Sequence, residues 1–342
     1  GTIYAGASEE LRALATATGI PVGDTQAGKG AINFDHPSAV GGVGSTGCDS
    51  GNHIADKADL IIGVGTRYSD FTTASKTQFK NPDVKFVNIN VTPFDAAKES
   101  AEMVVADARE ALAALTEALA DYRVEAAYSE EITAEKEAWL KATERCYHLD
   151  HGPLPAQTEV FGALNELMGE EDVVINAAGS MPGDLQALWQ ARSPLQYHVE
   201  YAFSCMGYEV PAAMGVKLAR PEAEVVSIVG DGTYQMLPME LATVVQENIK
   251  VIYVLLQNYG FCSIGALSES RGSQRFGTKY RRRGEGSHLA DEQVIDGVDI
   301  AANARSWGLD VLEVHTIAEF KEAYRQAEAS DRPTMIHIET DL

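Results

Sequence analysis

The amino-acid sequence predicts an α/β protein of two doubly wound domains, each a parallel sheet flanked by helices, joined by a helical linker. Short apolar runs rich in Val and Ile alternate with segments of helical periodicity along most of the chain. The 342 residues, 45% of them hydrophobic, suffice for two cores. Residues 123–150 break the alternation with a Glu-, Ala- and Lys-rich helical pattern. We therefore expect a first domain over 1–122, the linker over 123–150 and a second domain over 151–342.

The first domain is expected to contain strands at 2–5, 20–22, 58–64 and 85–91 and helices at 7–18 and 108–122, with Asp107 as N-cap of the last helix. Its most credible ligand-facing turn is Gly63–Arg67, which follows a clear strand. The segment Gly42–Gly47 matches the GxGxxG spacing of dinucleotide sites, but no clean buried strand leads into it in the sequence. We interpret that segment as a flexible or closely packed loop.

The second domain is expected to contain helices at 156–168, 207–218, 300–307 and 317–328 and strands at 173–176, 225–229, 251–256, 311–314 and 334–338. A loop-rich region is expected over 262–292. It concentrates six cations in an acidic chain, namely Arg271, Arg275, Lys279, Arg281, Arg282 and Arg283. These cations either steer an anionic or polyhydroxylated substrate or balance neighbouring acids on a mobile surface loop, and the sequence favours neither.

The most informative stretch is Val225–Gly260. A short buried strand ends at Gly230-Asp231-Gly232, a helical segment that begins near Pro238 and ends at Asn248 follows, and a second buried strand ends just before Asn258. Asp231 and Asn258, 27 positions apart, thus span one strand–helix–strand unit. A right-handed crossover makes the two strands parallel, so both polar residues project from the carboxyl edge of one sheet.

One carboxylate, one amide oxygen and a nearby backbone carbonyl make an all-oxygen ligand set that suits Mg²⁺. The backbone amides of Gly232 and Thr233 would face phosphate groups. A GDG alone is more often an ordinary strand-to-helix turn, with an Asn such as Asn258 acting as a cap. The spacing between Asp231 and Asn258, one strand–helix–strand unit, instead favours a ligand site over an ordinary turn.

Composition excludes several classes of function. A formal net charge of −23 argues against nucleic-acid binding. The four cysteines lie far apart without a CxxC pair, which indicates reduced thiols and a cytoplasmic protein. No apolar run approaches the ~20 residues of a membrane span, and no signal peptide opens the chain. The chain starts at Gly1 without Met, inside what looks like the opening of a strand, so we expect a processed or truncated polypeptide. His148 and His151 are interpreted as exposed linker residues rather than a metal pair.

The GDG followed by an Asn one βαβ unit later resembles the fingerprint of the acetolactate-synthase-like superfamily of thiamine diphosphate enzymes, and the resemblance covers essentially the whole chain. These enzymes have a pyrimidine-binding, a central and a diphosphate-binding domain, and this chain is similar to the second and third. The resemblance implies thiamine diphosphate and Mg²⁺ as cofactors. It makes Asp231, Asn258 and the Gly260 carbonyl the metal ligands, and it assigns contacts to the cofactor to Gly179, Ser180, Ser204, Met206, Gly230, Gly232, Thr233, Met236 and Gly260.

Within that assignment, Met206 props the cofactor in its bent shape. The Ser204 carbonyl and the Met236 amide meet the aminopyrimidine ring. Three segments resemble the branch of the superfamily that opens a polyhydroxylated cyclic 1,2-diketone by C–C bond hydrolysis in myo-inositol catabolism: Thr25–Gly30, Gly65–Phe79 and Ser204–Pro211. A 2-oxo-acid decarboxylase or carboligase of the same superfamily stays an alternative. So does a non-catalytic subunit that binds a nucleotide or scaffolds a partner.

The superfamily's catalytic Glu belongs to the pyrimidine-binding domain, and the sequence offers no candidate for it. The resemblance therefore implies that this chain carries half of an active site. The other half would come from a pyrimidine-binding domain of the same parent polypeptide or of a companion chain. At least a homodimer is expected, because the superfamily forms its sites between subunits.

Overall fold

A computed structural model describes residues 1–201, 203–273, 275–281 and 297–341. The chain forms two compact units, one of residues 1–145 with 183–197 and the other of residues 146–182 with 198–342. The domain limits expected from the sequence stay a prediction. In the described residues no helix is both long and apolar enough to cross a membrane.

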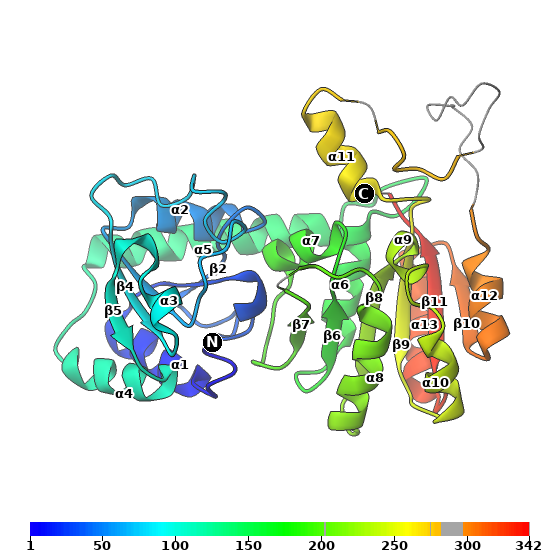
Figure 1. The fold of residues 1–342 in the computed structure, drawn as a ribbon, viewed down its shortest axis with the longest axis horizontal. Coiled ribbons are helices and arrows are strands. Elements are labelled where there is room, and N and C mark those ends of the chain that lie inside the picture. The colour runs from blue at the N-terminus through cyan, green and yellow to red at the C-terminus, as the bar shows by residue number, and fades with distance from the viewer. Residues whose placement is uncertain (202, 274, 282–296, 342) are drawn as a thin grey trace. The chain divides into compact units, whose positions relative to one another are not determined.

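The first unit alternates strands and helices along the chain (Figure 1). Its strands are β1 (Val22–Asp24), β2 (Ala39–Gly42), β3 (Leu60–Val64), β4 (Lys85–Asn90) and β5 (Glu102–Val105). Its helices are α1 (Ser8–Thr18), α2 (Asp49–Lys57), α3 (Pro93–Ala96), α4 (Ala108–Ala118) and most of α5 (Ala126–Tyr147), with short 3-10 turns η1 (Gln26–Gly28) and η2 (Lys98–Ser100).

The strands of the first unit form two separate parallel sheets, β1-β2 and β3-β4-β5. Helices α1 and α4 pack together over a core that includes Leu11, Leu14 and Leu112. A second cluster joins Val40 of β2 to Ile54 of α2. Helices thus cover both faces of the sheet layer, as expected for a doubly wound domain.

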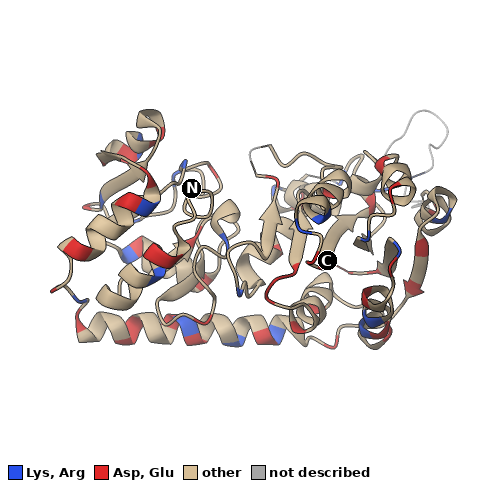
Figure 2. Ribbon diagram, turned by 90° about the horizontal axis from the view of Figure 1, so that it is seen from below, with Lys and Arg blue, Asp and Glu red and all other residues tan. Residues whose placement is uncertain are grey.

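Local signals explain two of these helices. Asp107 caps α4 as predicted, because its carboxylate accepts the N–H of Arg109 at 2.8 Å. Most of the predicted linker forms helix α5, the longest helix in Figure 2, along which acidic and basic residues are interspersed. Trp139 anchors α5 by donating its indole N–H to the Ala187 carbonyl at 2.7 Å.

Three sequence expectations for the first unit are wrong. Residues 2–5 form turns rather than a strand, with the Ala5 N–H bonded to the Gly1 carbonyl. The strand expected at 20–22 is displaced to β1. The GxGxxG segment does follow a buried strand, β2, and leads into α2. It is closely packed, because a Cβ on Gly44 would lie 2.2 Å from the Phe71 carbonyl oxygen.

The second unit contains strands β6 (Val173–Asn176), β7 (Tyr197–Val199), β8 (Val225–Gly230), β9 (Ile252–Gln257), β10 (Asp310–Val314) and β11 (Thr334–Glu339). Its helices are α6 (Gln157–Leu167), the start of α7 (Met181–Leu188), α8 (Glu209–Ala219), α9 (Asp231–Tyr234), α10 (Glu240–Gln246), α11 (Cys262–Ser270), α12 (Ile300–Trp307) and α13 (Ile317–Ala329). From Gly183 onward, α7 counts with the first unit.

One six-stranded sheet runs through the second unit in the order β10-β11-β9-β8-β6-β7. Every residue of β8 and β9 is buried, as in parallel strands covered on both faces. Their side chains share a core with α8, α10 and α12, in which Tyr253, Leu241 and Ile300 are nearly inaccessible. This core fixes the positions of the strand ends.

The structure corrects the expectations for the second unit in detail. The region expected to be loop-rich begins with helix α11, while residues 282–296, including Arg282 and Arg283, lie outside the described residues. The segment between β8 and β9 forms two helices, α9 and α10. Asn248 follows α10 in the left-handed conformation, φ 49°, which agrees with its predicted role at the helix end. The short strand β7 and helix α7 were not predicted.

Candidate functional site

Three neighbouring parallel strands of the second unit end at the same edge of the sheet. In the register of β8 and β9, Gly230 lies opposite Leu256, so Asp231 and Asn258 both follow directly at the carboxyl edge. β6 pairs with β8 on the other side, and Ala178–Ser180 come just beyond its end. The predicted crossover is therefore confirmed, and it brings three candidate segments together.

Asp231 connects two of these strand ends. Its side chain is 1% exposed, its Oδ1 accepts the N–H of Gly232 at 2.9 Å and its Oδ2 accepts the N–H of Gly260 at 3.1 Å. Burial raises the pKa of this carboxyl to about 6, against the lowering effect of these hydrogen bonds. The carboxylate is thus held in place by the backbone of both strand ends before any ligand arrives.

Asn258 supplies the second oxygen. Its Oδ1 is buried and has no hydrogen-bond partner among the described residues. An unsatisfied buried acceptor is unfavourable, and a bound cation would satisfy it. The Gly260 carbonyl oxygen lies 3.3 Å from the position that a Cβ on Gly232 would occupy. These oxygens fit Mg²⁺, which prefers carboxylate and carbonyl ligands completed by water and phosphate.

A metal site made of acidic, His or Cys side chains alone is not found among the residues that the structure describes. In the described part of the chain, no group of three or more His, Cys, Asp or Glu side chains could hold a metal ion. A cation at this edge would therefore depend on the amide oxygen of Asn258 and on backbone carbonyls as well as on Asp231. This requirement favours a hard cation over zinc.

Glycines allow a ligand to approach the backbone closely at two of the three segments. A Cβ on Gly232 would lie 2.8 Å from the Phe261 ring, and Gly179 adopts φ 93°. A Cβ on Gly230 would meet Met181 at 3.3 Å. The Gly232 N–H is occupied by Asp231 in this structure, so its contact with phosphate stays a prediction.

Glu209 is a buried residue of the site that the sequence did not single out. It is fully buried, and its two carboxyl oxygens accept the Thr233 hydroxyl at 3.1 and 3.2 Å. Its Oε1 also accepts the Ala178 N–H at 3.3 Å, and the Gly207 N–H bonds to Thr233 Oγ1 at 2.7 Å. Burial raises the pKa of Glu209. The available signal was a carboxylate at the start of a mostly apolar helix, whose other charged residue is Lys217 near its end.

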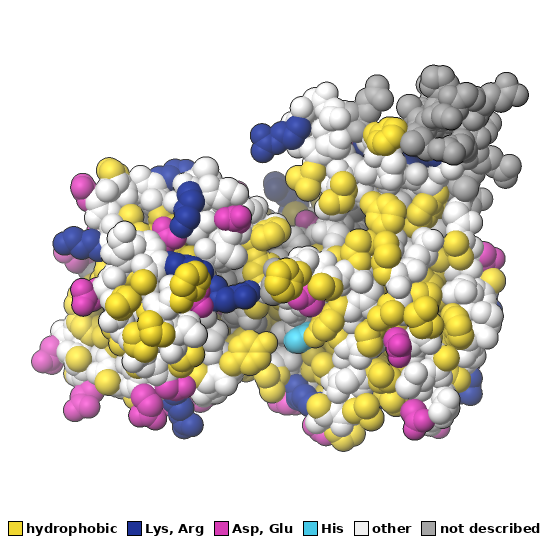
Figure 3. Space-filling model, viewed as in Figure 1, with side chains coloured by type: hydrophobic (Ala, Val, Ile, Leu, Met, Phe, Trp, Pro, Cys, Tyr) yellow, Lys and Arg dark blue, Asp and Glu magenta, His cyan; other side chains and the backbone are white. Residues whose placement is uncertain are grey.

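The other residues predicted to contact the cofactor lie near this edge of the sheet and are more exposed than Asp231. A Cβ on Gly207 would lie 3.1 Å from Met236 Cβ, which brings the Met206 segment beside Met236. Met206 is 39% and Met236 is 49% exposed. Ser204 adopts φ 50°, and the Ser180 hydroxyl donates to Gln157 at 3.0 Å. Hydrophobic side chains are exposed over α8 and α10 in Figure 3.

The cation-rich segment is only partly described. Arg275 forms an ion pair with Glu269 at 2.7 Å, which supports the charge-balancing interpretation for this residue. Tyr280 accepts a hydrogen bond from Gln235 at 2.5 Å, so the segment reaches α9. Its role in steering a substrate stays a prediction.

Comparison with known families gives two matches. Residues 177–338 match the model described as thiamine pyrophosphate enzyme, C-terminal TPP binding domain, and residues 1–115 match the central domain of thiamine pyrophosphate enzymes. The first match contains Asp231, Asn258 and Gly260. It also contains the strand ends that the site is built on.

Curated relatives agree with these matches. The chain is 42% identical over 362 residues to 3D-(3,5/4)-trihydroxycyclohexane-1,2-dione hydrolase of Bacillus cereus (strain AH820), covering 99% of this chain and 56% of the relative. It is 41% identical, with the same coverage, to 3D-(3,5/4)-trihydroxycyclohexane-1,2-dione hydrolase of Bacillus anthracis (strain CDC 684 / NRRL 3495). The chain thus spans just over half the length of these relatives. The chain belongs to the thiamine pyrophosphate enzymes, and it contains the central domain and the C-terminal TPP binding domain of that family.

Proposed function

We propose that this chain is the cofactor-anchoring part of a thiamine diphosphate- and Mg²⁺-dependent hydrolase that opens a polyhydroxylated cyclic 1,2-diketone at a C–C bond. The curated relatives, named as trihydroxycyclohexane-1,2-dione hydrolases, support this substrate class over pyruvate-type substrates. The observation that carries the proposal is the unsatisfied Asn258 Oδ1 one strand away from the buried Asp231 carboxylate. The proposed product is 5-deoxyglucuronate, and the proposed role lies in inositol catabolism.

In this proposal the residues of the chain hold the two ends of the cofactor. Asp231, Asn258 and the Gly260 carbonyl would hold Mg²⁺, whose charge would neutralise the diphosphate. Gly230, Gly232, Thr233, Gly179 and Ser180 surround the phosphate groups. Met206 would support the bound cofactor, and the Ser204 carbonyl and the Met236 N–H would orient its ring. In this structure the Met236 N–H is donated to the Thr233 carbonyl at 3.0 Å. When bound, thiamine diphosphate supplies the nucleophile and electron sink for the C–C cleavage.

The rest of the site is proposed to come from a pyrimidine-binding domain, which supplies the acid that activates the cofactor ring. The chain spans 56% of its relatives, so they contain sequence beyond the aligned part. Large apolar side chains are exposed on the second unit, including Met206, Met236, Met239, Ile264 and Leu267. Such apolar exposure is typical of surfaces that another polypeptide covers. A homodimer or higher oligomer would provide that cover.

Calorimetry with thiamine diphosphate and Mg²⁺ tests the anchoring role. We expect the wild-type chain to bind and Asp231→Ala to lose at least ~100-fold in affinity, since even residues behind the ligands are worth 10–100-fold. Asp172→Ala is a matched control. Asp172 also accepts two backbone N–H groups, from Gly169 and Glu224, but at the opposite end of the sheet. Absence of binding by the wild type, or equal binding by Asp231→Ala, would refute the proposal.

Substrate class is tested separately, on the chain assembled with a pyrimidine-binding domain. We expect consumption of trihydroxycyclohexane-1,2-dione and no consumption of pyruvate, and no turnover of either by the isolated chain. Turnover of pyruvate alone would favour the decarboxylase or carboligase alternative. Turnover by the isolated chain would refute the incomplete-site argument.

A further inference from the structure

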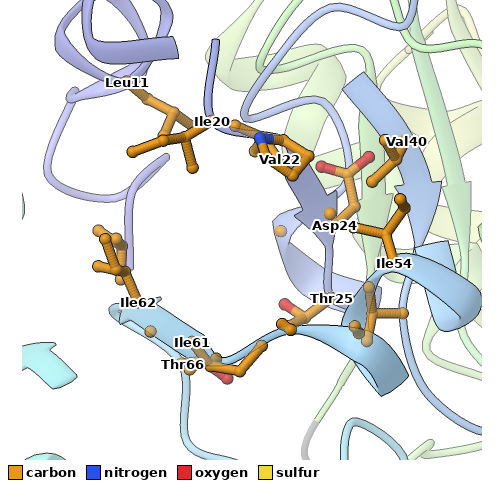
Figure 4. Close-up of a pocket in the computed structure, with 18 of the residues that line it drawn as sticks. Leu11, Ile20, Val22, Asp24, Thr25, Val40, Ile54, Ile61, Ile62 and Thr66 are labelled. Atoms are coloured by element: carbon orange, nitrogen blue, oxygen red, sulfur yellow. The ribbon is translucent and has the colours of Figure 1, made fainter. Parts of the chain in front are cut away.

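Two places in the described residues stand out, and they offer different chemistry. The first unit contains a cavity of about 400 Å³ that is lined largely by aliphatic side chains, among them Val22 and Ile61 in Figure 4. Such walls provide few polar groups to orient a ligand. The second unit contains a strained turn, residues 258–260, at the candidate metal site. Because the polar groups of this turn have defined partners, they can be connected to a specific role at the site.

Tyr259 occupies the middle of the turn in an unfavourable backbone conformation. It lies between Asn258 and Gly260, which supply two of the proposed metal ligands, and its φ is 61°. A positive φ is rare for a bulky side chain, and such strain persists only where surrounding contacts hold it in place. The contacts of Tyr259 therefore show what holds the turn.

A carboxylate on the neighbouring strand contacts the side chain of Tyr259. The Tyr259 hydroxyl donates a hydrogen bond of 2.5 Å to Oε1 of Glu339, the last residue of β11. Strand β11 pairs in parallel with β9, and Glu339 lies opposite Gln257 in that register. Hydrogen bonds to carboxylates are short and stronger than those between neutral groups. Glu339 thus connects the strained residue to the central sheet of the second unit.

Backbone contacts hold the same turn against residues 278–280. The Tyr259 carbonyl accepts the Tyr280 N–H at 3.3 Å, and the Phe261 N–H donates to the Thr278 carbonyl at 2.7 Å. A Cβ on Gly260 would lie 2.3 Å from the Thr278 carbonyl oxygen, so the two segments are in close contact. The turn is therefore held by backbone contacts to residues 278–280 and by the side-chain contact between Tyr259 and Glu339.

The conformation of Tyr259 determines where its two neighbours lie. The Gly260 N–H reaches Asp231 Oδ2 at 3.1 Å, and the Asn258 Oδ1 is buried without a hydrogen-bond partner among the described residues. Planar peptide bonds join Tyr259 to both neighbours, so a change in its backbone angles would move both of them. Contacts that orient metal ligands are typically worth 10–100-fold in metal affinity.

We propose that Glu339 is a positioning residue of the cofactor site: through the Tyr259 hydroxyl, it holds the turn so that the Asn258 and Gly260 oxygens face a divalent cation. Its effect on affinity rests on the proposed Mg²⁺-binding role of this turn. Glycine would adopt a φ of 61° without strain, but it has no hydroxyl. The hydrogen bond to Glu339 thus explains why a tyrosine occupies a position whose conformation favours glycine.

Two measurements on the full chain test this role: hydrogen exchange without cofactor, and calorimetry with thiamine diphosphate over a range of Mg²⁺ concentrations. We expect Glu339→Ala and Tyr259→Phe to speed exchange in a peptide covering residues 258–261 by about tenfold. Both should raise the Mg²⁺ concentration needed for cofactor binding by about tenfold or more. Tyr259→Gly should weaken cofactor binding similarly, although it relieves the strain in φ.

Two further variants serve as controls. Glu339→Gln should behave as the wild type, because its amide oxygen can still accept the Tyr259 hydroxyl. Glu313→Ala removes a carboxylate of strand β10 that is paired with Arg305, and it should change neither measurement. Peptides covering the middle of β10 and β11 should exchange at the wild-type rate in every variant, which separates positioning of the turn from a general loss of stability.

Unchanged exchange at residues 258–261 in Glu339→Ala would overturn the proposal, whether or not the chain binds the cofactor. Faster exchange with an unchanged Mg²⁺ dependence would also overturn it, because the contact would then be structural only. So would wild-type binding by Tyr259→Gly, or no rescue by Glu339→Gln. If Glu339→Ala does not fold, Tyr259→Phe decides. Absence of cofactor binding by the wild type would instead refute the proposed function, and exchange alone would then test whether Glu339 holds the turn.

Discussion

The two units show what a continuous sheet provides and what an interrupted one lacks. In the second unit, unbroken pairing from β10 to β7 brings the ends of β6, β8 and β9 to one edge, where Asp231 and Asn258 meet. In the first unit, the described strands fall into two sheets with a cavity between β1 and β3. Strand pairing therefore positions the polar groups of the site, and a gap in pairing creates an apolar space.

Buried carboxylates extend this comparison. In the second unit Asp231 is held by backbone N–H groups. In the first unit Asp24 faces the Lys29 ammonium at 3.8 Å, and Lys29 is 1% exposed. Burial lowers the pKa of Lys29 and raises that of Asp24. We expect the arrangement around Asp231 to serve ligand binding. We expect the Asp24–Lys29 pair to affect only stability.

The largest effect is expected for Lys29→Met. Removing the cation leaves Asp24 buried without its charge partner, so the free energy of unfolding should fall by about 3–5 kcal/mol. The double variant with Asp24→Leu should recover most of this loss. Urea unfolding measures both, and cofactor binding by the folded single variant should be unchanged. A loss under ~1 kcal/mol for the single variant would contradict the buried-pair interpretation.

Asn258→Leu should separate binding from stability. Removing this proposed metal ligand should weaken the proposed Mg²⁺-dependent cofactor binding by roughly 100-fold. Removing an unsatisfied buried acceptor should leave the cofactor-free chain as stable as the wild type, or more stable by about 1 kcal/mol. Calorimetry and thermal unfolding without cofactor measure the two effects. Lower stability together with unchanged binding would show that Asn258 has a structural role.

Glu209→Ala should weaken the connection between the two turns that follow β6 and β8. It leaves the Thr233 hydroxyl and the Ala178 N–H without their acceptor, so we expect a loss of about 1–3 kcal/mol in stability and about tenfold in cofactor affinity. Glu209→Gln should retain both, because its amide oxygen can still accept the Ala178 N–H and the Thr233 hydroxyl. Equal losses in the two variants would indicate that the ionised form is required.

The last prediction concerns the pH dependence of the stability of the first unit. Burial raises the pKa of Asp24 to about 7 from 3.8, so the folded chain retains a proton that the unfolded chain releases. The contribution of Asp24 to stability is therefore complete below about pH 4 and is lost as pH rises through about 7, with a slope of at most ~1.4 kcal/mol per pH unit. Asp24→Asn should remove this slope in urea unfolding between these two pH values. An unchanged slope would assign it to other groups.

Most of the second unit could be predicted because its signals are local. The apolar runs that became β6, β8 and β9 are continuous and flanked by helical periodicity, and they place Asp231 and Asn258 without further information. β2 was missed because Ala39-Val40-Gly41-Gly42 has the composition of a loop and gains its strand from pairing with β1. Residues 2–5 look like a strand but form turns, since no neighbouring strand pairs with them in the described residues.

The sequence by itself determined the α/β class, the crossover from β8 to β9 and the residue types of the proposed magnesium–diphosphate site, because periodicity and turn chemistry act over a few residues. Tertiary structure alone decided that Asn258 Oδ1 is unsatisfied and that Glu209 connects Thr233 to Ala178. It alone decided that β1 and β3 face a cavity. These features depend on which strands become neighbours, and strand pairing joins residues that are far apart in the chain.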